Sequence, residues 1–253
     1  MRLAPLLVLL VATVAVANDS TALLEAGGIV LTTSKDVVME SEDLRIARDK
    51  VRVSYVFRNT GPDDVRTRVA FPVPEWDDDD EGDVLLDRKS DNPMGFSLTV
   101  DGRPTTFETE VRRKDGKVKV THHWEQVFPK GRPVKVAHAY TPAAGSFFFA
   151  GDDVDADLEA DLISLYCVGP KLLAEIRDKP RFLTTVHYVL KTGANWKGPI
   201  GRFTLTLEKE HPQDKVSVCI PDTRRTTPTT FEVKRTDWSP TEDLRILFVP
   251  AAG

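Results

Sequence analysis

Apolar and polar residues alternate along most of this chain, and this period of two constrains its fold more than any other feature. Successive side chains of a β-strand point to opposite faces, so such alternation gives each strand one apolar face. The segments with this pattern are 51–57, 65–71, 96–100, 105–111, 118–122, 134–140, 182–190, 203–207, 216–218 and 244–248. Many short strands separated by Gly- and Pro-containing turns predict a mainly β chain, an antiparallel β-sandwich of one body or two packed lobes.

Turn residues between these segments predict how the strands connect. Turn-forming residues at 59–64 separate the first two strands, which indicates a hairpin. Asp101-Gly102 and Asp115-Gly116 are strong two-residue turn signals. We therefore expect a meander of long antiparallel strands over residues 96–122.

One helix interrupts the strand pattern. Pro170 suits the first turn of a helix, and Leu172, Leu173 and Ile176 then share one face. Residues 152–165 are ambiguous between helix and strand. The sequence thus predicts one or two short helices around residues 155–178.

The N-terminus has the pattern of a cleaved secretory signal. Arg2 precedes an apolar run over residues 3–16, and Ala15-Val16-Ala17 supplies a small-residue cleavage site. The run is shorter than the roughly 20 apolar residues that span a bilayer. We expect a signal peptide over 1–17, cleavage between Ala17 and Asn18, no transmembrane anchor, and a periplasmic or secreted protein. The remainder, 18–250, is predicted as a single domain, or as lobes 18–145 and 180–250 joined by a partly helical segment.

Export changes the interpretation of the two cysteines. An oxidising compartment favours a disulfide between Cys167 and Cys219. Closing a loop of about 50 residues stabilises the fold by roughly 4 kcal/mol in the chain-entropy treatment. The alternative is two buried free thiols that pack as small apolar residues.

Charge and motifs exclude several classes of function. The net charge is −5 and no long Lys/Arg cluster is present, which argues against nucleic-acid binding. The chain has no H-E-x-x-H, G-x-S-x-G, G-x-G-x-x-G or P-loop motif. His122 and His123 are adjacent, so they face opposite sides of a strand. His138 would lie near His122 if their strands pair, but the sequence does not set that register. We therefore predict no catalytic or cofactor-binding residues and structural or surface histidines.

Two acidic stretches, 75–83 and 152–161, raise the question of calcium. Asp153, Asp155 and Asp157 have the spacing that opens an EF-hand loop, but Leu158 and Ser164 occupy its turn-glycine and bidentate-glutamate positions. Solvated acidic loops that bind no cofactor are the simpler interpretation, and a calcium site is the alternative. The four tryptophans suggest either a sugar-stacking platform or packing in the core and turns; they are Trp76, Trp124, Trp196 and Trp238.

Several runs of sequence resemble the bacterial exported family called domain of unknown function 4424. These runs are residues 18–22, 27–31, 39–44, 51–59, 69–74, 124, 128–129, 138–142, 188–200, 216–219 and 228–232. The resemblance covers nearly the whole chain after residue 17. It implies export and one full-length family domain, and it brings no established activity or catalytic residues. The pattern V-x-Y-x-F-x-N followed by F-P-x-P also resembles β-sandwich domains of the vault/inter-α-trypsin type.

These observations favour an exported, non-catalytic bacterial envelope protein with a structural or binding role, whose partner is an envelope protein or a glycan. One alternative is a carbohydrate-active or calcium-dependent enzyme or binding module that uses the acidic and aromatic loops. Another is an adhesion or assembly module, which predicts an exposed apolar patch or an open edge strand. Trp196 lies between Gly193 and Gly198 and is expected to pack against the sheet.

Overall fold

Burial alternates along the strands as the sequence predicts. In β4 (Val51–Asn59) and β11 (Pro133–Tyr140) every second side chain is buried, and those between are exposed or half-buried. The computed structural model describes residues 20–25, 28–32, 35–78, 86–149, 156–190 and 196–251, with the backbone alone over 20–32.

The described strands form three sheets, and the chain is mainly β. The six-stranded sheet contains β1 (Ser20–Glu25), β2 (Gly28–Thr32), β5 (Val65–Pro72), β6 (Trp76–Asp77), β9 (Glu108–Lys114) and β10 (Lys117–Phe128). The eight-stranded sheet contains β3 (Val37–Ala47), β4, β7 (Ser97–Val100), β8 (Arg103–Pro104), β11, β14 (Ile200–Glu208), β16 (Arg224–Arg225) and β17 (Thr230–Trp238). The four-stranded sheet contains β12 (Gly145–Phe149), β13 (Arg181–Tyr188), β15 (Lys215–Val218) and β18 (Leu244–Val249).

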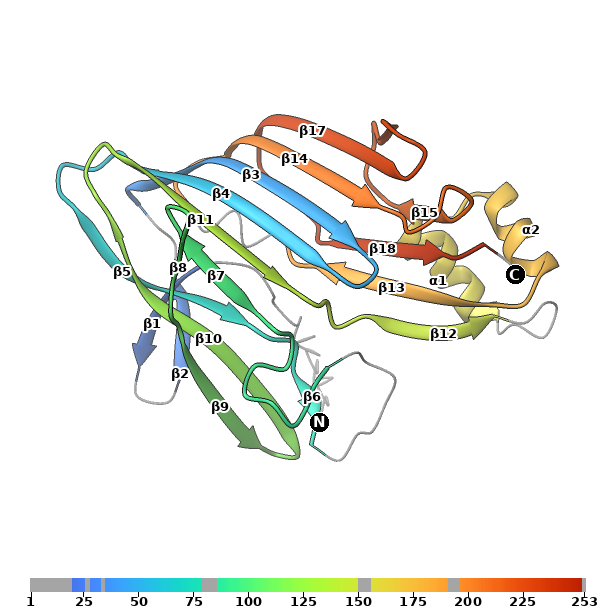
Figure 1. Cartoon of the computed structure of the whole chain (residues 1–253), viewed down its shortest axis with the longest axis horizontal. Coiled ribbons are helices and arrows are strands. Elements are labelled where there is room, and N and C mark those ends of the chain that lie inside the picture. The colour runs from blue at the N-terminus through green and yellow to red at the C-terminus, as the bar shows by residue number, and fades with distance from the viewer. Residues whose placement is uncertain are drawn as a thin grey trace, which may run out of the picture.

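The two smaller sheets pack on the same apolar face of the eight-stranded sheet, towards opposite ends (Figure 1). At one end the ring of Phe71 in β5 lies 5.4 Å from that of His138 in β11. At the other, the hydroxyl of Tyr55 in β4 lies 3.0 Å from that of Tyr188 in β13. Side chains of all three sheets share one buried cluster. The arrangement is a β-sandwich, which confirms the predicted fold class.

Two short helices cover the other face of the four-stranded sheet. These are α1 (Ala156–Tyr166) and α2 (Pro170–Asp178), so the prediction of one or two helices around 155–178 is confirmed. Leu162 of α1 and Ile176 of α2 pack against Leu183 and Leu247 in a second apolar cluster. Burial of these side chains explains why a helix of only nine residues is stable here.

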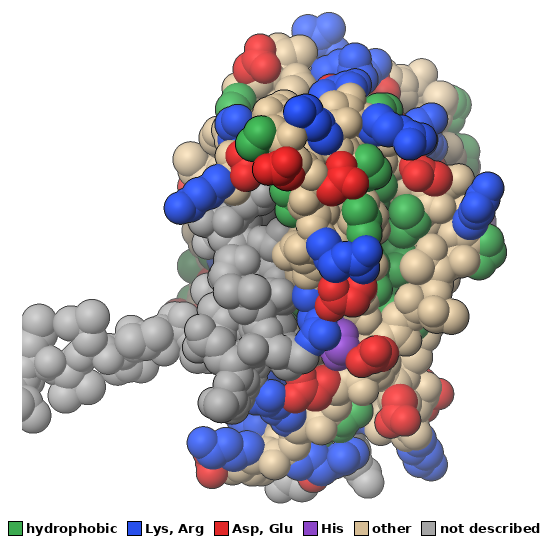
Figure 2. All heavy atoms as spheres, turned by 90° about the vertical axis from the view of Figure 1, so that its left-hand side faces the viewer, with side chains coloured by type: hydrophobic (Ala, Val, Ile, Leu, Met, Phe, Trp, Pro, Cys, Tyr) green, Lys and Arg blue, Asp and Glu red, His purple; other side chains and the backbone are tan. Residues whose placement is uncertain are grey.

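The outer surfaces carry charges of both signs. Glu208 accepts hydrogen bonds from Arg52 at 2.8 Å and Arg45 at 3.1 Å on the open face of the eight-stranded sheet. Basic and acidic side chains are interspersed over the end of the molecule seen in Figure 2. Exposed pairs of this kind contribute about 0–1 kcal/mol each, so they favour solubility more than stability.

The predicted hairpin between residues 51–57 and 65–71 is wrong. β4 pairs with β3 and β11, whereas β5 pairs with β1 and β10 in the other sheet. The connection therefore crosses from one sheet to the other, and the fully buried Asn59 stabilises it. The Nδ2 of Asn59 donates to Asp63 O and to Phe128 O, both at 2.8 Å, and its Oδ1 accepts from Gly61 N. Alternation gives each strand one apolar face, but a hairpin and a crossing satisfy that pattern equally well.

The predicted meander over residues 96–122 is correct in its two turns and wrong in its continuity. Asp101-Gly102 joins β7 to β8 and Asp115-Gly116 joins β9 to β10, with all four residues at positive φ. However, β8 belongs to the eight-stranded sheet and β9 to the six-stranded sheet. The chain changes sheets between the two hairpins.

The longest-range pairing involves a strand that the alternation did not single out. β3 pairs in parallel with β14, so residues 41–47 lie beside residues 202–208. Strands from both predicted lobes, 18–145 and 180–250, thus share one sheet. The lobe and domain boundaries stay predictions, and the predicted signal peptide, residues 1–17, lies outside the described residues.

Candidate functional site

The acidic residues proposed for calcium are only partly described. Asp153 and Asp155 lie outside the described residues, as do residues 79–83 of the first acidic stretch. Asp157 lies in the first turn of α1, where a negative charge interacts favourably with the helix dipole. Within the part of the chain that the structure describes, no three His, Cys, Asp or Glu side chains are grouped to hold a metal ion.

His122 and His138 lie in the core rather than in a polar centre. The rings of His122 and His138 pack on Phe96 at 5.2 and 5.3 Å, although their strands belong to different sheets and do not pair. Thr109 Oγ1 forms a 2.9 Å hydrogen bond with His122 Nδ1. Burial lowers the pKa of His122 to about 4, and the neighbouring His123 adds to the effect. The imidazole of His122 is therefore neutral near pH 7, and it packs as part of the core.

The tryptophans do not form an exposed platform. Trp124 and Trp196 are buried, and Trp238 packs on Phe203 at 4.7 Å. The ring of Trp196 lies 4.3 Å from that of Phe57 and 5.9 Å from that of Phe128. Trp196 thus packs against the sheet, as expected from the sequence.

The predicted disulfide is present. Cys167 and Cys219 are bonded, 52 positions apart in the chain. Cys167 lies in the turn between α1 and α2, and Cys219 directly follows β15. Ser217 Oγ, at the end of β15, also donates to the carbonyl of Tyr166 at 2.8 Å. The bond and the neighbouring hydrogen bond hold the start of α2 against the edge of the four-stranded sheet.

A hollow of about 470 Å³, here called the α2 pocket, lies beside this junction. Its lining consists of Gly169, Pro170, Lys171, Leu172 and Glu175 from α2 and its start, Lys209, Pro212, Asp214, Lys215 and Val216 from the β14–β15 connection and β15, and Arg225 and Phe231 from β16 and β17. The volume lies within the roughly 300–1,000 Å³ that is typical of small-molecule sites. Each wall comes from a different element, so only the tertiary fold assembles the pocket.

Lys209 is the buried cation of the α2 pocket. Only 8% of its surface is exposed, and its Nζ donates to Asp214 O at 2.6 Å and Pro212 O at 2.9 Å. The same Nζ lies 5.6 Å from the centroid of the Phe231 ring, a cation–π distance. Burial lowers the pKa of Lys209, and the positive charges of Arg225 and Lys215 lower it further, against the opposing effect of Asp214. Positive charge is thus concentrated at this site.

The start of α2 adds a second positive element to the pocket. Gly169 is the N-cap and offers no side-chain cap, Pro170 begins the helix, and the first turn has no acidic residue. The first intrahelical bond runs from Leu173 N to Gly169 O. The amides of Lys171 and Leu172 therefore have no acceptor within the helix, and the positive end of the helix dipole borders the pocket.

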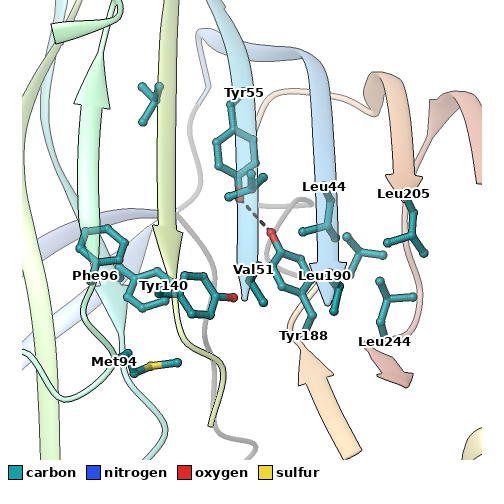
Figure 3. Packing of buried hydrophobic residues seen from close by; sticks show 14 of the residues in the cluster. Leu44, Val51, Tyr55, Met94, Phe96, Tyr140, Tyr188, Leu190, Leu205 and Leu244 are labelled. Atoms are coloured by element: carbon teal, nitrogen blue, oxygen red, sulfur yellow. Dashed lines mark hydrogen bonds between the residues drawn. The ribbon is translucent and has the colours of Figure 1, made fainter. Parts of the chain in front are cut away.

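A second, smaller hollow of about 210 Å³ lies between the three sheets, and Met94, Tyr140, His187, Tyr188 and Arg245 contribute to its lining. Burial and the charge of Arg245 lower the pKa of His187. Tyr188, which also lines this hollow, donates a 3.0 Å hydrogen bond to Glu42. Its hydroxyl lies 3.0 Å from that of Tyr55 (Figure 3). Since this hollow is smaller than most ligand sites, the α2 pocket is the stronger candidate.

One aromatic pair is exposed at a sheet edge. Phe148 of β12 and Phe182 of β13 are 54% and 63% exposed, and their rings lie 5.1 Å apart. β12 is the outermost strand of the four-stranded sheet.

The residues of the α2 pocket were not identified from the sequence. Lys171, Lys209, Lys215 and Arg225 are spread over four elements and follow no spacing motif. In the sequence nothing distinguishes them from other Lys and Arg residues, and only the fold brings them together around one hollow. In contrast, the pairing of Cys167 with Cys219 followed from the cysteine count and the expected compartment.

Comparison with known proteins identifies a family and a solved structure of similar fold. A sequence profile described as domain of unknown function (DUF4424) matches residues 17–123 and 114–247. No curated protein matches in sequence. A crystal structure from Legionella pneumophila, of a protein provisionally described as nutrient-binding, has 17% identity and a TM-score of 0.57, covering 93% of this chain and 72% of that one. This similarity shows a common fold.

Two further structures are more distant. Yeast LTA4 hydrolase has 9% identity and a TM-score of 0.41, covering 84% of this chain and 28% of that one. An M1 zinc metallopeptidase from Deinococcus radiodurans has 10% identity and a TM-score of 0.35, covering 87% and 43%. The chain spans less than half the length of either protein, and neither similarity carries a functional argument.

Proposed function

The chain belongs to the family described as domain of unknown function 4424, and from that premise we propose that it is an exported, non-catalytic protein that binds a small ligand in the α2 pocket. The observation that carries the proposal is the pocket itself, whose buried Lys209 and apolar wall converge on a hollow of ligand size. The description of the Legionella protein as nutrient-binding is in keeping with a binding role.

Two observations support export. Residues 2–17 have the composition of a secretory signal, and a disulfide joins Cys167 to Cys219. None of the helices described is long and apolar enough to cross a membrane. We place the protein in the periplasm or outside the cell, after cleavage between Ala17 and Asn18. N-terminal sequencing of the extracytoplasmic protein should start at Asn18; a chain that retains Met1 and stays in the cytoplasm would contradict export.

The binding function is tested by a screen of thermal unfolding with amino acids, organic acids, sugars and nucleotides, followed by native mass spectrometry. We expect at least one class to raise the midpoint in the wild type. Leu172→Trp, which fills the pocket, should abolish that shift. Leu165→Trp is the matched control, because Leu165 is also a half-buried helix residue of the second apolar cluster but does not line the pocket. No binding by any class, or equal binding by both variants, would refute the proposal.

The exposed aromatic pair favours assembly as a second candidate function. Phe148 and Phe182 form an apolar patch beside the open edge of β12, a feature that pairs readily with another chain. A second copy of this chain is the partner we propose for this edge. Sedimentation should show a dimer that the double variant Phe148→Ser, Phe182→Ser dissociates, and a wild-type monomer at high concentration would exclude this candidate.

A further inference from the structure

Cationic side chains outnumber anionic ones in the lining of the α2 pocket. Four cationic side chains contribute to the lining, namely Lys171, Lys209, Lys215 and Arg225, against the carboxylates of Glu175 and Asp214. Both carboxylates are already engaged. Asp214 accepts from His211 N at 2.8 Å and from Ala251 N at 2.9 Å, and Glu175 pairs with Lys215 at 3.8 Å. Lys171 and Arg225 therefore face a pocket whose acidic groups serve other partners.

The donors of the pocket are held in place before any ligand arrives. Arg225 donates from Nε to Thr227 O at 3.0 Å and from Nη2 to Pro228 O at 2.8 Å, which fixes the plane of its guanidinium. Lys209 is fixed by two carbonyls, and the start of α2 is held by the disulfide beside it. Preorganised donors lose little side-chain entropy when they bind an anion.

The remaining lining is apolar. Leu172 and Val216 are half-buried, and the ring of Phe231 lies beneath Lys209. An inorganic ion would leave these surfaces in contact with water. An anion with an apolar body would cover them, and it would gain roughly 25 cal/mol for each Å² of apolar surface removed from water.

We propose that the α2 pocket binds a small organic carboxylate, with its carboxylate towards Lys171, Arg225 and the start of α2, and its apolar body against Leu172, Val216 and Phe231. This inference rests on the proposed binding function and specifies its ligand class. A carboxylate suits the site because the planar guanidinium of Arg225 matches its two oxygens.

The test compares carboxylates with their uncharged amides. The probes are hexanoate, 3-phenylpropanoate and succinate, each with its amide, together with sulfate and inorganic phosphate at equal ionic strength. Isothermal titration should detect saturable binding of at least one carboxylate, with its amide and both inorganic ions at least about tenfold weaker. Arg225→Gln and Lys171→Gln should each lower the affinity for the carboxylate by about tenfold.

The matched controls are Arg132→Gln and Lys119→Gln, which change exposed cations outside the pocket and should leave affinity unchanged. Lys209 is left unchanged in these variants. Its Nζ donates hydrogen bonds to two backbone carbonyls, so its replacement would disturb the fold as well as the pocket. Equal binding of carboxylate and amide, both lost in Leu172→Trp, would overturn the anion inference and leave the binding function standing. Binding of sulfate or phosphate as tight as that of every carboxylate, or no carboxylate binding at all, would also overturn it. Failure of every class in the broader screen would instead remove the binding function.

Discussion

The hydroxyl of Tyr188 donates a 3.0 Å hydrogen bond to the carboxyl group of Glu42, and both side chains are buried where β13 packs on β3. The Tyr55 hydroxyl lies 3.0 Å from the same oxygen of Tyr188 (Figure 3). Burial raises the pKa of Tyr188 well above its ordinary value, and the charge of Glu42 adds to this effect. The phenol of Tyr188 is therefore protonated near pH 7, where it can donate to Glu42.

We expect Tyr188→Phe to lower the free energy of unfolding by about 1–3 kcal/mol, because Glu42 then loses a buried donor. Urea unfolding of a double-mutant cycle with Glu42→Leu checks the cause. In the Glu42→Leu background the same change should cost less, with a coupling of about 0.5–3 kcal/mol. Strict additivity of the two changes would show that this hydrogen bond does not link the sheets.

Removing the disulfide should loosen α2 in particular. We expect Cys167→Ser, Cys219→Ser to lower the free energy of unfolding by about 2–4 kcal/mol, as for a loop of this length. Hydrogen exchange should quicken at the amides of α2 (Pro170–Asp178), while those in β4 keep their relative protection. Unchanged exchange in α2 would contradict the role given to this bond at the pocket wall.

His122 should make the protein less stable in mild acid. Its pKa is about 4 in the fold against 6.5 ordinarily, so between these values the unfolded chain binds a proton that the folded chain excludes. Stability contributed by neutral His122 is therefore present above pH 6.5 and is lost as the pH falls, by about 2 kcal/mol from pH 7.5 to pH 5. Urea unfolding at both pH values should show this increment disappear in His122→Gln. His211→Gln, which changes an exposed histidine, should retain it.

Calcium should leave thermal unfolding unchanged. Asp157 interacts with the dipole of α1, and the described residues include no group of metal-ligating side chains around it. Scans in excess calcium and in chelator should give the same midpoint. A higher midpoint in calcium, lost in Asp157→Asn, would instead identify a metal site at the start of α1.

The sequence predicted local structure well where one strand or turn decides it. Asp115-Gly116 forms its turn because both residues adopt positive φ, which Asp tolerates and Gly favours. The alternation in residues 51–57 and 134–140 predicted β4 and β11, since a strand with one buried face needs that pattern. The same pattern could not assign β4 and β5 to different sheets, because apolar faces are compatible with many partners.

The sequence alone therefore indicated many of the strands, the two Asp-Gly turns and, through the expected compartment, the bond between Cys167 and Cys219. Only the tertiary structure decided that β3 pairs with β14 and that Lys209, Arg225 and Lys171 border one hollow. The two kinds of feature depend on interactions over different distances along the chain. Backbone dihedrals and side-chain periodicity act over a few residues, whereas strand partners and pocket walls depend on the packing of segments far apart in the chain.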